Sequence, residues 1–317
     1  MTKEKFVIEL GSSNTVIYKL GYGIVLREPS VLALDKVEKT YEVGTKAKKM
    51  QGKTDDTLLV VEPIEHGVIT NEAYAELLLK GFLEKVCLVP YSNAEITFCT
   101  SIGLSDNQLL SFMTIAYDIG VGKVKFTDVC LSALKGAKVM TDKANALACV
   151  NLGGGTINYA VISLGKVIEG FSVNFGGKDM DKAIIDYIRA IKNMEITSSM
   201  AEKVKNECGS LYTQDTTNME VAGIDVDTKR PVTEIITASD VRDAIIHFFE
   251  NIMKGVEHLL YSCSPDVISD VSRNGIYLVG GLANFTGLEN YLSKKLNLRV
   301  IVPDEPENCT ILGACLK

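Results

Sequence analysis

The sequence has little of what would mark a disordered chain or a metal site. It contains 7 prolines among 317 residues and 46% hydrophobic residues, which excludes a disordered chain. Its 3 histidines are widely separated, and none of its 8 cysteines forms a C-x-x-C pair. A zinc or redox centre of the usual spacing is therefore excluded. Most cysteines lie in apolar runs, so we expect buried free thiols in a reducing compartment.

Charge and hydropathy argue against nucleic acid as a partner and against a membrane span. The formal net charge is −7, and the lysines and arginines are scattered, which disfavours nucleic-acid binding. The N-terminal residues are polar and lack the apolar core of a signal peptide. The longest uncharged stretch, 144–165, contains a triple glycine and strand-like alternation, so it is not a transmembrane helix. The sequence predicts a cytoplasmic protein.

Two short segments, one near each end of the first half of the chain, are near copies of each other. Glu9–Thr15 reads ELGSSNT and Asn151–Thr156 reads NLGGGT, each between two apolar runs rich in β-formers. This pattern predicts two strand–turn–strand hairpins, and small residues let their backbone N–H groups approach an anion. An ordinary glycine turn is the alternative for either hairpin alone. Together they predict a duplicated domain that clamps one polyphosphate through Gly11, Ser12, Ser13, Asn14, Gly153, Gly154, Gly155 and Thr156.

Two further segments are candidates for holding the rest of a nucleotide. Val279–Asn284 leads from a strand into a helix, and such a turn can pass under the base or the α-phosphate. Its candidate residues are Gly280, Gly281, Leu282, Ala283 and Asn284; a simple strand–helix turn is the alternative. Glu202 and Lys205 lie three residues apart on a predicted helix. They either hold ribose and base or form a solvated ion pair.

Periodicity and turn residues also predict several element boundaries. We expect one strand region over Gly23–Leu34 and a helix over Asp106–Tyr117 with Asp106 as its N-cap. Glu220–Ile236 reads as strand-like and irregular. Ser239 is expected to cap a long helix that ends at Ser262, and Phe285–Leu296 is expected to be a helix.

The order hairpin, hairpin, Gly-Gly turn resembles the actin/sugar-kinase/heat-shock-chaperone ATPase superfamily. Closer matches are to the MreB/Mbl bacterial actins, and they cover essentially the whole chain. The matching segments are Gly23–Val31, Val43–Met50, Pro63–Ile69, Gly153–Leu164, Gly176-Gly177 with Asp181, and Ala201–Ser210.

The resemblance implies an actin-like fold of two duplicated ribonuclease-H-like α/β lobes around a nucleotide cleft. Lobe I would span residues 1–140 and lobe II residues 141–317, with the C-terminus returning to lobe I. ATP or ADP with Mg²⁺ would be the cofactors, and Gly177 would join the nucleotide-binding residues. The implied partners are further copies of the chain in a protofilament, the membrane surface and cell-wall synthesis proteins.

The sequence departs from the family pattern at the nucleotide. Glu9 and Asn151 stand where the family has aspartates that organise magnesium and its waters. Val129 stands at the position of the catalytic glutamate, which leaves Asp128 as the one nearby candidate, and Leu282 replaces a glycine. These departures predict that ATP hydrolysis is weak or lost.

Three functions fit the sequence to different degrees. The first is a cytoskeletal filament subunit that guides cell-wall synthesis and so determines cell shape. The second is a small-molecule kinase of the same superfamily, which needs a carboxylate base such as Asp128 or Glu9. The third is a non-filament actin-like adaptor, for which we would expect a missing or replaced subdomain.

Overall fold

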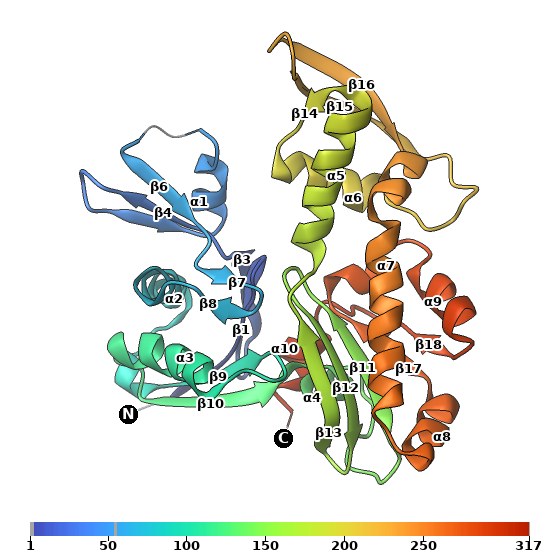
Figure 1. Ribbon diagram of the computed structural model, residues 1–317. Helices are drawn as coiled ribbons and strands as arrows, with labels where there is room; N and C mark the ends of the chain where they lie inside the picture. The colour runs from blue at the N-terminus through green and yellow to red at the C-terminus, as the bar shows by residue number, and fades with distance from the viewer. Residues whose placement is uncertain (1–2, 54–55, 317) are drawn as a thin grey trace.

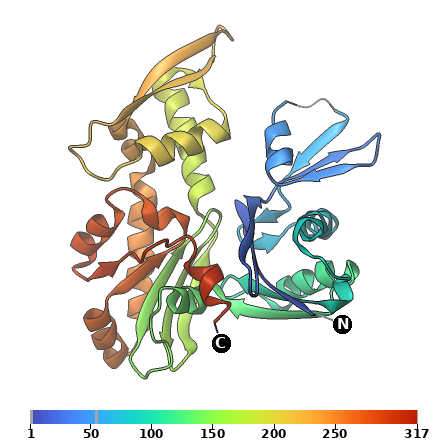
Figure 2. The ribbon, with the colours of Figure 1, turned by 180° about the vertical axis from the view of Figure 1, so that it is seen from behind.

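The computed structural model describes residues 3–53 and 56–316. Its two halves stand side by side and meet at their lower ends, and each carries a smaller upper part (Figures 1 and 2). A five-stranded sheet forms the lower part of each half. The first sheet uses strands from the N-terminal part of the chain and the second uses strands that follow it, so each half folds largely from contiguous sequence.

The first sheet has the strand order β10-β9-β1-β2-β3. Strands β1, β2 and β3 are antiparallel neighbours, β9 runs parallel to β1, and β10 runs parallel to β9. Helix α2 packs Leu78, Leu79 and Phe82 onto this sheet, where all three are fully buried. The bounds are β1 (Glu4–Leu10), β2 (Asn14–Lys19), β3 (Gly23–Pro29), α2 (Glu72–Val86), η1 (Tyr91–Asn93), β9 (Ala94–Thr100), α3 (Asp106–Asp118), β10 (Lys123–Asp128) and α4 (Val129–Gly136).

The second sheet repeats this arrangement in the order β13-β12-β11-β17-β18. Strands β11, β12 and β13 are antiparallel neighbours, and β17 runs parallel to β11 as β9 does to β1. The two sheets therefore share one topology, as the predicted duplication requires. The bounds are β11 (Leu147–Leu152), β12 (Ile157–Ser163), β13 (Lys166–Val173), α7 (Ala238–Tyr261), α8 (Pro265–Asn274), β17 (Ile276–Val279), η2 (Gly281–Asn284), α9 (Leu288–Leu296), β18 (Val300–Ile301) and α10 (Cys309–Gly313).

The central strands are continuously apolar because both of their faces are buried. Along β11, Ala148 and Val150 face the core of the second half, whereas Leu147 and Cys149 face a separate core between the halves. Successive strand residues point to opposite faces, and a sheet covered on both sides loses the alternation of apolar and polar residues. The same rule explains the buried run Phe6–Ile8 in β1.

Each half carries a three-stranded upper sheet with its own helices. In the first half the strand order is β5-β4-β6, and in the second it is β14-β15-β16. Helices α1 and α6, which belong to these upper parts, lie on either side of the space between the halves (Figure 1). The bounds are β4 (Leu32–Asp35), β5 (Tyr41–Val43), α1 (Thr45–Met50), β6 (Leu58–Val61), β7 (Ile64–Glu65), β8 (Val68–Ile69), α5 (Gly177–Lys192), β14 (Met194–Glu195), α6 (Ser198–Cys208), β15 (Asn218–Asp225) and β16 (Pro231–Thr237).

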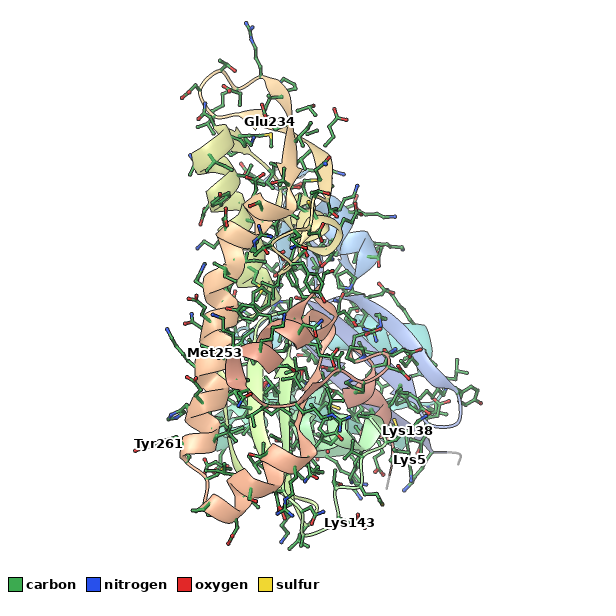
Figure 3. The ribbon with its side chains drawn as sticks, turned by 90° about the vertical axis from the view of Figure 1, so that its right-hand side faces the viewer. Lys5, Lys138, Lys143, Glu234, Met253 and Tyr261 are labelled. Atoms are coloured by element: carbon green, nitrogen blue, oxygen red, sulfur yellow. The ribbon has the colours of Figure 1, made fainter. Side chains whose placement is uncertain are left out.

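The longest helix, α7, runs from below the upper sheet to the lower end of the second half. Figure 3 shows Glu234 on β16 above this helix, Met253 along the helix and Tyr261 at its lower end. Its buried residues Phe249, Ile252 and Val256 follow helical spacing and pack on the second sheet. Tyr261 is 90% exposed, so the helix leaves the core at that point.

A third core, formed by residues from both sheets, joins the halves at their base. It includes Val7 from β1, Cys149 from β11 and Cys309 from α10. Helix α10 contacts α4 and the first-sheet strands β1 and β2. The division of the chain into lobes at residue 140 stays a prediction. All eight cysteines are free, as expected, and five of them are buried.

Several predicted boundaries were wrong for local reasons. Ser105, not Asp106, caps α3, because the Ser105 hydroxyl accepts from the backbone N–H of Gln108 and forms a capping box with it. Thr237, not Ser239, caps α7 in the same way with Asp240. Both true caps have extended backbone, which a residue inside the first helical turn does not.

Three other segments also differ from expectation. Gly23–Leu34 is two strands, because β3 ends at Pro29, which has no N–H to continue the ladder. Glu220–Ile236 lies within a regular hairpin of β15 and β16. The helix expected over 285–296 begins only at Leu288, after Gly287 at φ 84°. Within residues 3–53 and 56–316, no helix is both long and apolar enough to cross a membrane.

Candidate functional site

The two predicted hairpins form and face each other between the halves. Their turns match: the Gly11 N–H donates to the Asn14 carbonyl at 3.1 Å, and the Gly153 N–H donates to the Thr156 carbonyl at 3.0 Å. The tips touch so closely that a Cβ on Gly154 would lie 2.0 Å from the Ser13 hydroxyl oxygen. Glycine is therefore required where the second hairpin meets the first.

A pocket of about 280 Å³ lies at this junction and takes its walls from both halves. A volume of this order is near the lower end of the range for small-molecule sites. Asp128, Ala283 and Asn284 are the predicted site residues that lie outside its lining. The predicted residues that do line it are Glu9, Gly11, Ser12, Ser13, Asn14, Asn151, Gly153, Gly154, Gly155, Thr156, Gly177, Glu202, Lys205, Gly280, Gly281 and Leu282.

Lys205 is buried in the wall of the pocket, where it pairs with a residue that helical spacing did not predict. Its ammonium donates to the Asp181 carboxylate at 2.7 Å and to the Gly177 carbonyl at 2.9 Å. The solvated pair between Lys205 and Glu202, which was one of the two alternatives, does not form, because Glu202 instead pairs with Lys48 across the cleft at 3.0 Å. Burial raises the pKa of Asp181, and the Lys205 charge opposes that shift.

Asn151 is held by a helix from the far end of the chain. Its amide nitrogen donates to the Thr310 hydroxyl at 3.0 Å, and both side chains are buried. A Cβ on Gly280, whose φ is 88°, would lie 2.8 Å from the Asn151 amide oxygen. Sequence reasoning missed Thr310, because no local motif links the C-terminal helix to the second hairpin.

Glu9 and Asn151, the predicted ligands of a cation and its waters, both line the pocket, as do the carboxylates of Asp181, Glu202 and Glu307. Burial raises the pKa of Glu9 to about 7, and the nearby Arg27 charge opposes the shift. Among the described residues, no group of three or more His, Cys, Asp and Glu is placed to hold a metal ion. One carboxylate and one amide fit Mg²⁺ only if phosphates and waters supply the remaining ligands, which is the usual manner of magnesium binding.

Val129 and Asp128, the residues at and beside the position expected for the catalytic glutamate, have different surroundings. Val129 lines the pocket, so the position expected for a catalytic glutamate faces the pocket but offers no polar side-chain atom. Asp128 is the N-cap of α4, and one of its oxygens accepts from the N–H groups of Cys130 at 2.8 Å and Leu131 at 3.0 Å. Burial raises the pKa of Asp128 against these bonds. The contacts of Asp128 are those of a helix cap.

The turn between β7 and β8 contacts both hairpins. A ring nitrogen of His66 lies 2.8 Å from the Gly155 carbonyl, and the Gly67 N–H donates to the Ser12 hydroxyl at 3.0 Å. Since a carbonyl only accepts, that ring nitrogen carries the proton. The matching segment Pro63–Ile69 was the only sequence signal for this turn, and it gave no hint of these contacts.

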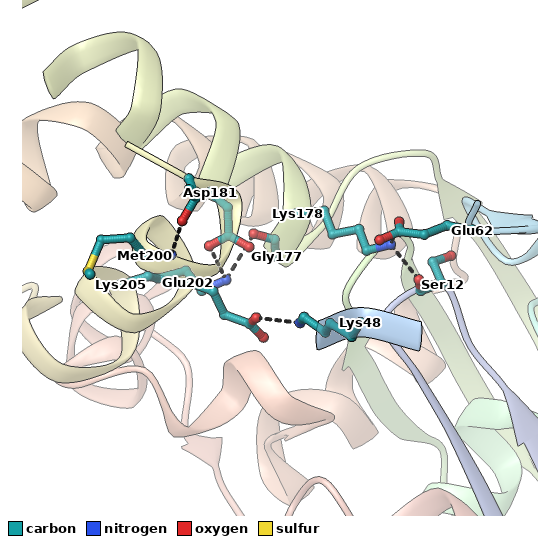
Figure 4. Close-up of polar contacts among 10 residues, drawn as sticks. Ser12, Lys48, Glu62, Gly177, Lys178, Asp181, Met200, Glu202 and Lys205 are labelled. Atoms are coloured by element: carbon teal, nitrogen blue, oxygen red, sulfur yellow. Dashed lines mark hydrogen bonds and ion pairs between the residues drawn. The ribbon is translucent and has the colours of Figure 1, made fainter. Parts of the chain in front are cut away.

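Two ion pairs cross the space between the upper parts (Figure 4). Lys48 of α1 reaches Glu202 of α6, and Lys178 at the start of α5 reaches Glu62. Lys178 also donates to the Ser12 carbonyl of the first hairpin at 2.5 Å. The upper parts are thus linked by side chains directly beside the pocket.

A model of the family described as MreB/Mbl protein matches residues 3–316. The chain belongs to the MreB/Mbl family. Cell shape-determining protein MreB of Escherichia coli is 31% identical to it, over 96% of this chain and 90% of that protein. Cell shape-determining protein Mbl of Bacillus subtilis is 28% identical, over 96% and 93%.

Two solved structures agree with the fold. The crystal structure of MreB5 of Spiroplasma citri bound to AMPPNP superposes with a TM-score of 0.93 at 27% identity, and covers 99% of this chain and 95% of that one. The MamK double helical filament superposes with a TM-score of 0.82 at 19% identity. The predicted actin-like fold of two duplicated lobes is confirmed.

Proposed function

We propose that this MreB/Mbl protein is a nucleotide-binding filament subunit that acts in cell-shape determination and is at most a weak ATPase. The observation that carries the proposal is the pocket of about 280 Å³ between the halves, whose walls include both phosphate hairpins. Family membership over residues 3–316 supports assembly into protofilaments. The relative from Spiroplasma citri has been solved with both AMPPNP and ADP.

Different residues would hold the phosphates, the ribose and the adenine of the nucleotide. Backbone N–H groups of Gly11–Asn14 and Gly153–Thr156 would hold the phosphates from two sides. Glu202 and the Lys205–Asp181 pair would hold the ribose, and Gly280–Leu282 would support the adenine. Mg²⁺, when bound, would neutralise phosphate charge; Glu9 and Asn151 would orient its waters.

Nucleotide binding is expected to stabilise the protein, and a melting experiment tests this. With millimolar ADP or ATP and magnesium, the unfolding temperature should rise, because a ligand that binds only the folded state stabilises it by RT ln(1 + [L]/Kd). Gly154→Val is the matched control, since its side chain would overlap Ser13 at the hairpin contact. No shift and no calorimetric heat for the unaltered protein would contradict nucleotide binding.

Assembly separates the filament from the two alternatives. At tens of micromolar with nucleotide, the protein should sediment at high speed and show protofilaments by negative-stain microscopy. A kinase or an adaptor would stay in the supernatant. The upper parts of both halves are present, so the missing subdomain expected of an adaptor is not seen in the described residues.

We further propose that the segment 86–91 touches the membrane surface, where cell-wall synthesis proteins would be reached. Leu88 is 83% exposed there. The Leu88 N–H donates to Glu4, whose other oxygen accepts from Lys19. Lys19 in turn lies over the ring of Tyr22, which is 75% exposed. Leu88 and Tyr22 therefore stand at one corner of the first half, free to enter a lipid interface.

Liposome flotation tests this contact. The double variant Leu88→Ser with Val89→Ser should lose nearly all flotation, because the two lost apolar side chains together remove about 3–6 kcal/mol of burial, on the order of a 100-fold or greater loss of membrane binding. Ile168→Ser, at a half-exposed site on β13 in the other half, is the control. Equal recovery of the double variant and the unaltered protein would remove the proposal.

A further inference from the structure

Within the described part of the chain, two ion pairs join the upper parts of the two halves, Lys48–Glu202 and Lys178–Glu62, and no other ion pair does so. Lys48 and Glu202 come within 3.0 Å, and their side chains are 34% and 40% exposed. Lys178 and Glu62 are 35% and 30% exposed. Every other ion pair of the described residues lies within one half. These two pairs are therefore placed to resist separation of the upper parts.

Both pairs line a second pocket beside the first. This second pocket has a volume of about 300 Å³, and its lining includes Lys48, Glu62, Lys178 and Glu202. It shares Ser13, Asp181 and Glu202 with the first pocket. The ion pairs consequently stand over the flank of the proposed nucleotide site and not at a remote surface.

Each pair is bonded to a part of the proposed nucleotide site. The Lys178 ammonium donates to the Ser12 carbonyl, and the Lys178 backbone N–H donates to the Gly154 carbonyl at 2.8 Å. Lys178 thus touches both phosphate hairpins. In the other pair, Glu202 lines the first pocket while Lys48 holds its carboxylate (Figure 4).

We propose that Lys48–Glu202 and Lys178–Glu62 form a clasp that holds the cleft closed over the nucleotide and slows its release. The inference rests on the proposed nucleotide binding. For the nucleotide to leave past this flank, the upper parts must separate, and both ion pairs must break first. Lys48 and Lys178 are positioning residues: they act through Glu202 and through the hairpin backbone.

Two further charged residues lie beside the clasp. Besides the four clasp residues, Lys182 and Asp181 line the second pocket, and Asp181 is paired with Lys205. Half-exposed ion pairs contribute modestly, so opening one pair should speed release about two- to fivefold. Salt screens the charges, so the contribution of both ion pairs to slow nucleotide release should weaken as the salt concentration rises.

Release of a fluorescent ADP analogue, chased with excess ATP in a stopped-flow instrument, measures the clasp. Lys48→Ala and Lys178→Ala should each release about two- to fivefold faster than the unaltered protein. Lys178→Glu, which places two carboxylates together, should release faster still, and adding Glu62→Lys should restore most of the difference. The release rate of the unaltered protein should rise with KCl concentration. The release rate of the double variant Lys48→Ala with Lys178→Ala should stay nearly constant.

Two controls keep the test specific. Lys46→Ala lies on α1 beside Lys48 and loses only the exposed pair with Glu42. Lys192→Ala lies on α5 with Lys178 and loses a pair with Glu234 within one half. Neither should change the release rate, and melting without nucleotide should show all variants folded.

The outcomes separate this inference from the proposed function. If the unaltered protein does not retain the analogue at all, nucleotide binding itself is contradicted. If it binds, but the clasp variants release at the rates of the controls, the clasp is overturned. If adding Glu62→Lys to Lys178→Glu does not slow release again, the role of the Lys178–Glu62 pair in the clasp is overturned.

Discussion

The double variant Val129→Glu with Asn151→Asp is expected to hydrolyse ATP about 10- to 100-fold faster than the unaltered protein. Val129 faces the pocket yet cannot accept a hydrogen bond from an attacking water. A carboxylate at this position would orient that water, and an aspartate at 151 would hold a magnesium-bound water more firmly than an amide does. The unaltered protein should release phosphate very slowly.

Phosphate release under saturating ATP and magnesium measures this effect. Asp128→Ala is the control, because the Asp128 carboxylate is engaged by the N–H groups of Cys130 and Leu131. It should lower stability by about 1 kcal/mol through the lost helix cap and leave turnover unchanged. Fast turnover in the unaltered protein that falls in Asp128→Ala would show that Asp128 is the base after all.

The second large effect is expected at the buried ion pair of the pocket wall. Lys205→Met should destabilise the protein by about 3–5 kcal/mol, because it leaves the buried Asp181 carboxylate without its counter-charge. Lys205 is 6% exposed and Asp181 is 8% exposed. For a chain of this size, such a loss lowers the unfolding temperature by roughly 10 °C.

The loss should depend on pH with a definite sign. Burial already raises the pKa of Asp181 above its unfolded value, and removing the Lys205 charge raises it further. In the variant the folded state therefore keeps a proton that the unfolded state releases, so stability falls as pH rises above the ordinary aspartate range. Lys205→Met should be closest to the unaltered protein near pH 5 and furthest from it near pH 8.

Chemical unfolding at several pH values gives the measurement. Lys203→Met is the matched control on the same helix, since its pair with Glu207 is exposed and 3.9 Å long; it should change stability by less than about 1 kcal/mol. Lys205→Met with Asp181→Leu should recover much of the loss, because both charges leave together. A single variant as stable as the control at every pH would contradict this account.

The sequence by itself determined the hairpins, the duplication and a large part of the pocket lining. Those features depend on local rules: small residues between apolar runs must turn, and an anion needs backbone N–H groups that only small residues leave accessible. Because the same pattern occurs at Glu9–Thr15 and Asn151–Thr156, the correspondence of the two halves is visible in the sequence alone. Resemblance added the identity of the family and the cleft between the lobes.

Only the tertiary structure decided which charges meet. Glu202 and Lys205 share one helix, but one reaches across the cleft to Lys48 and the other turns inward to Asp181. Thr310, His66 and Lys178 join the site from segments far along the chain. Helical spacing shows which side chains share a face, whereas a buried or cross-cleft partner depends on how segments far apart in the chain pack together. That is why the hairpins could be predicted and the clasp could not.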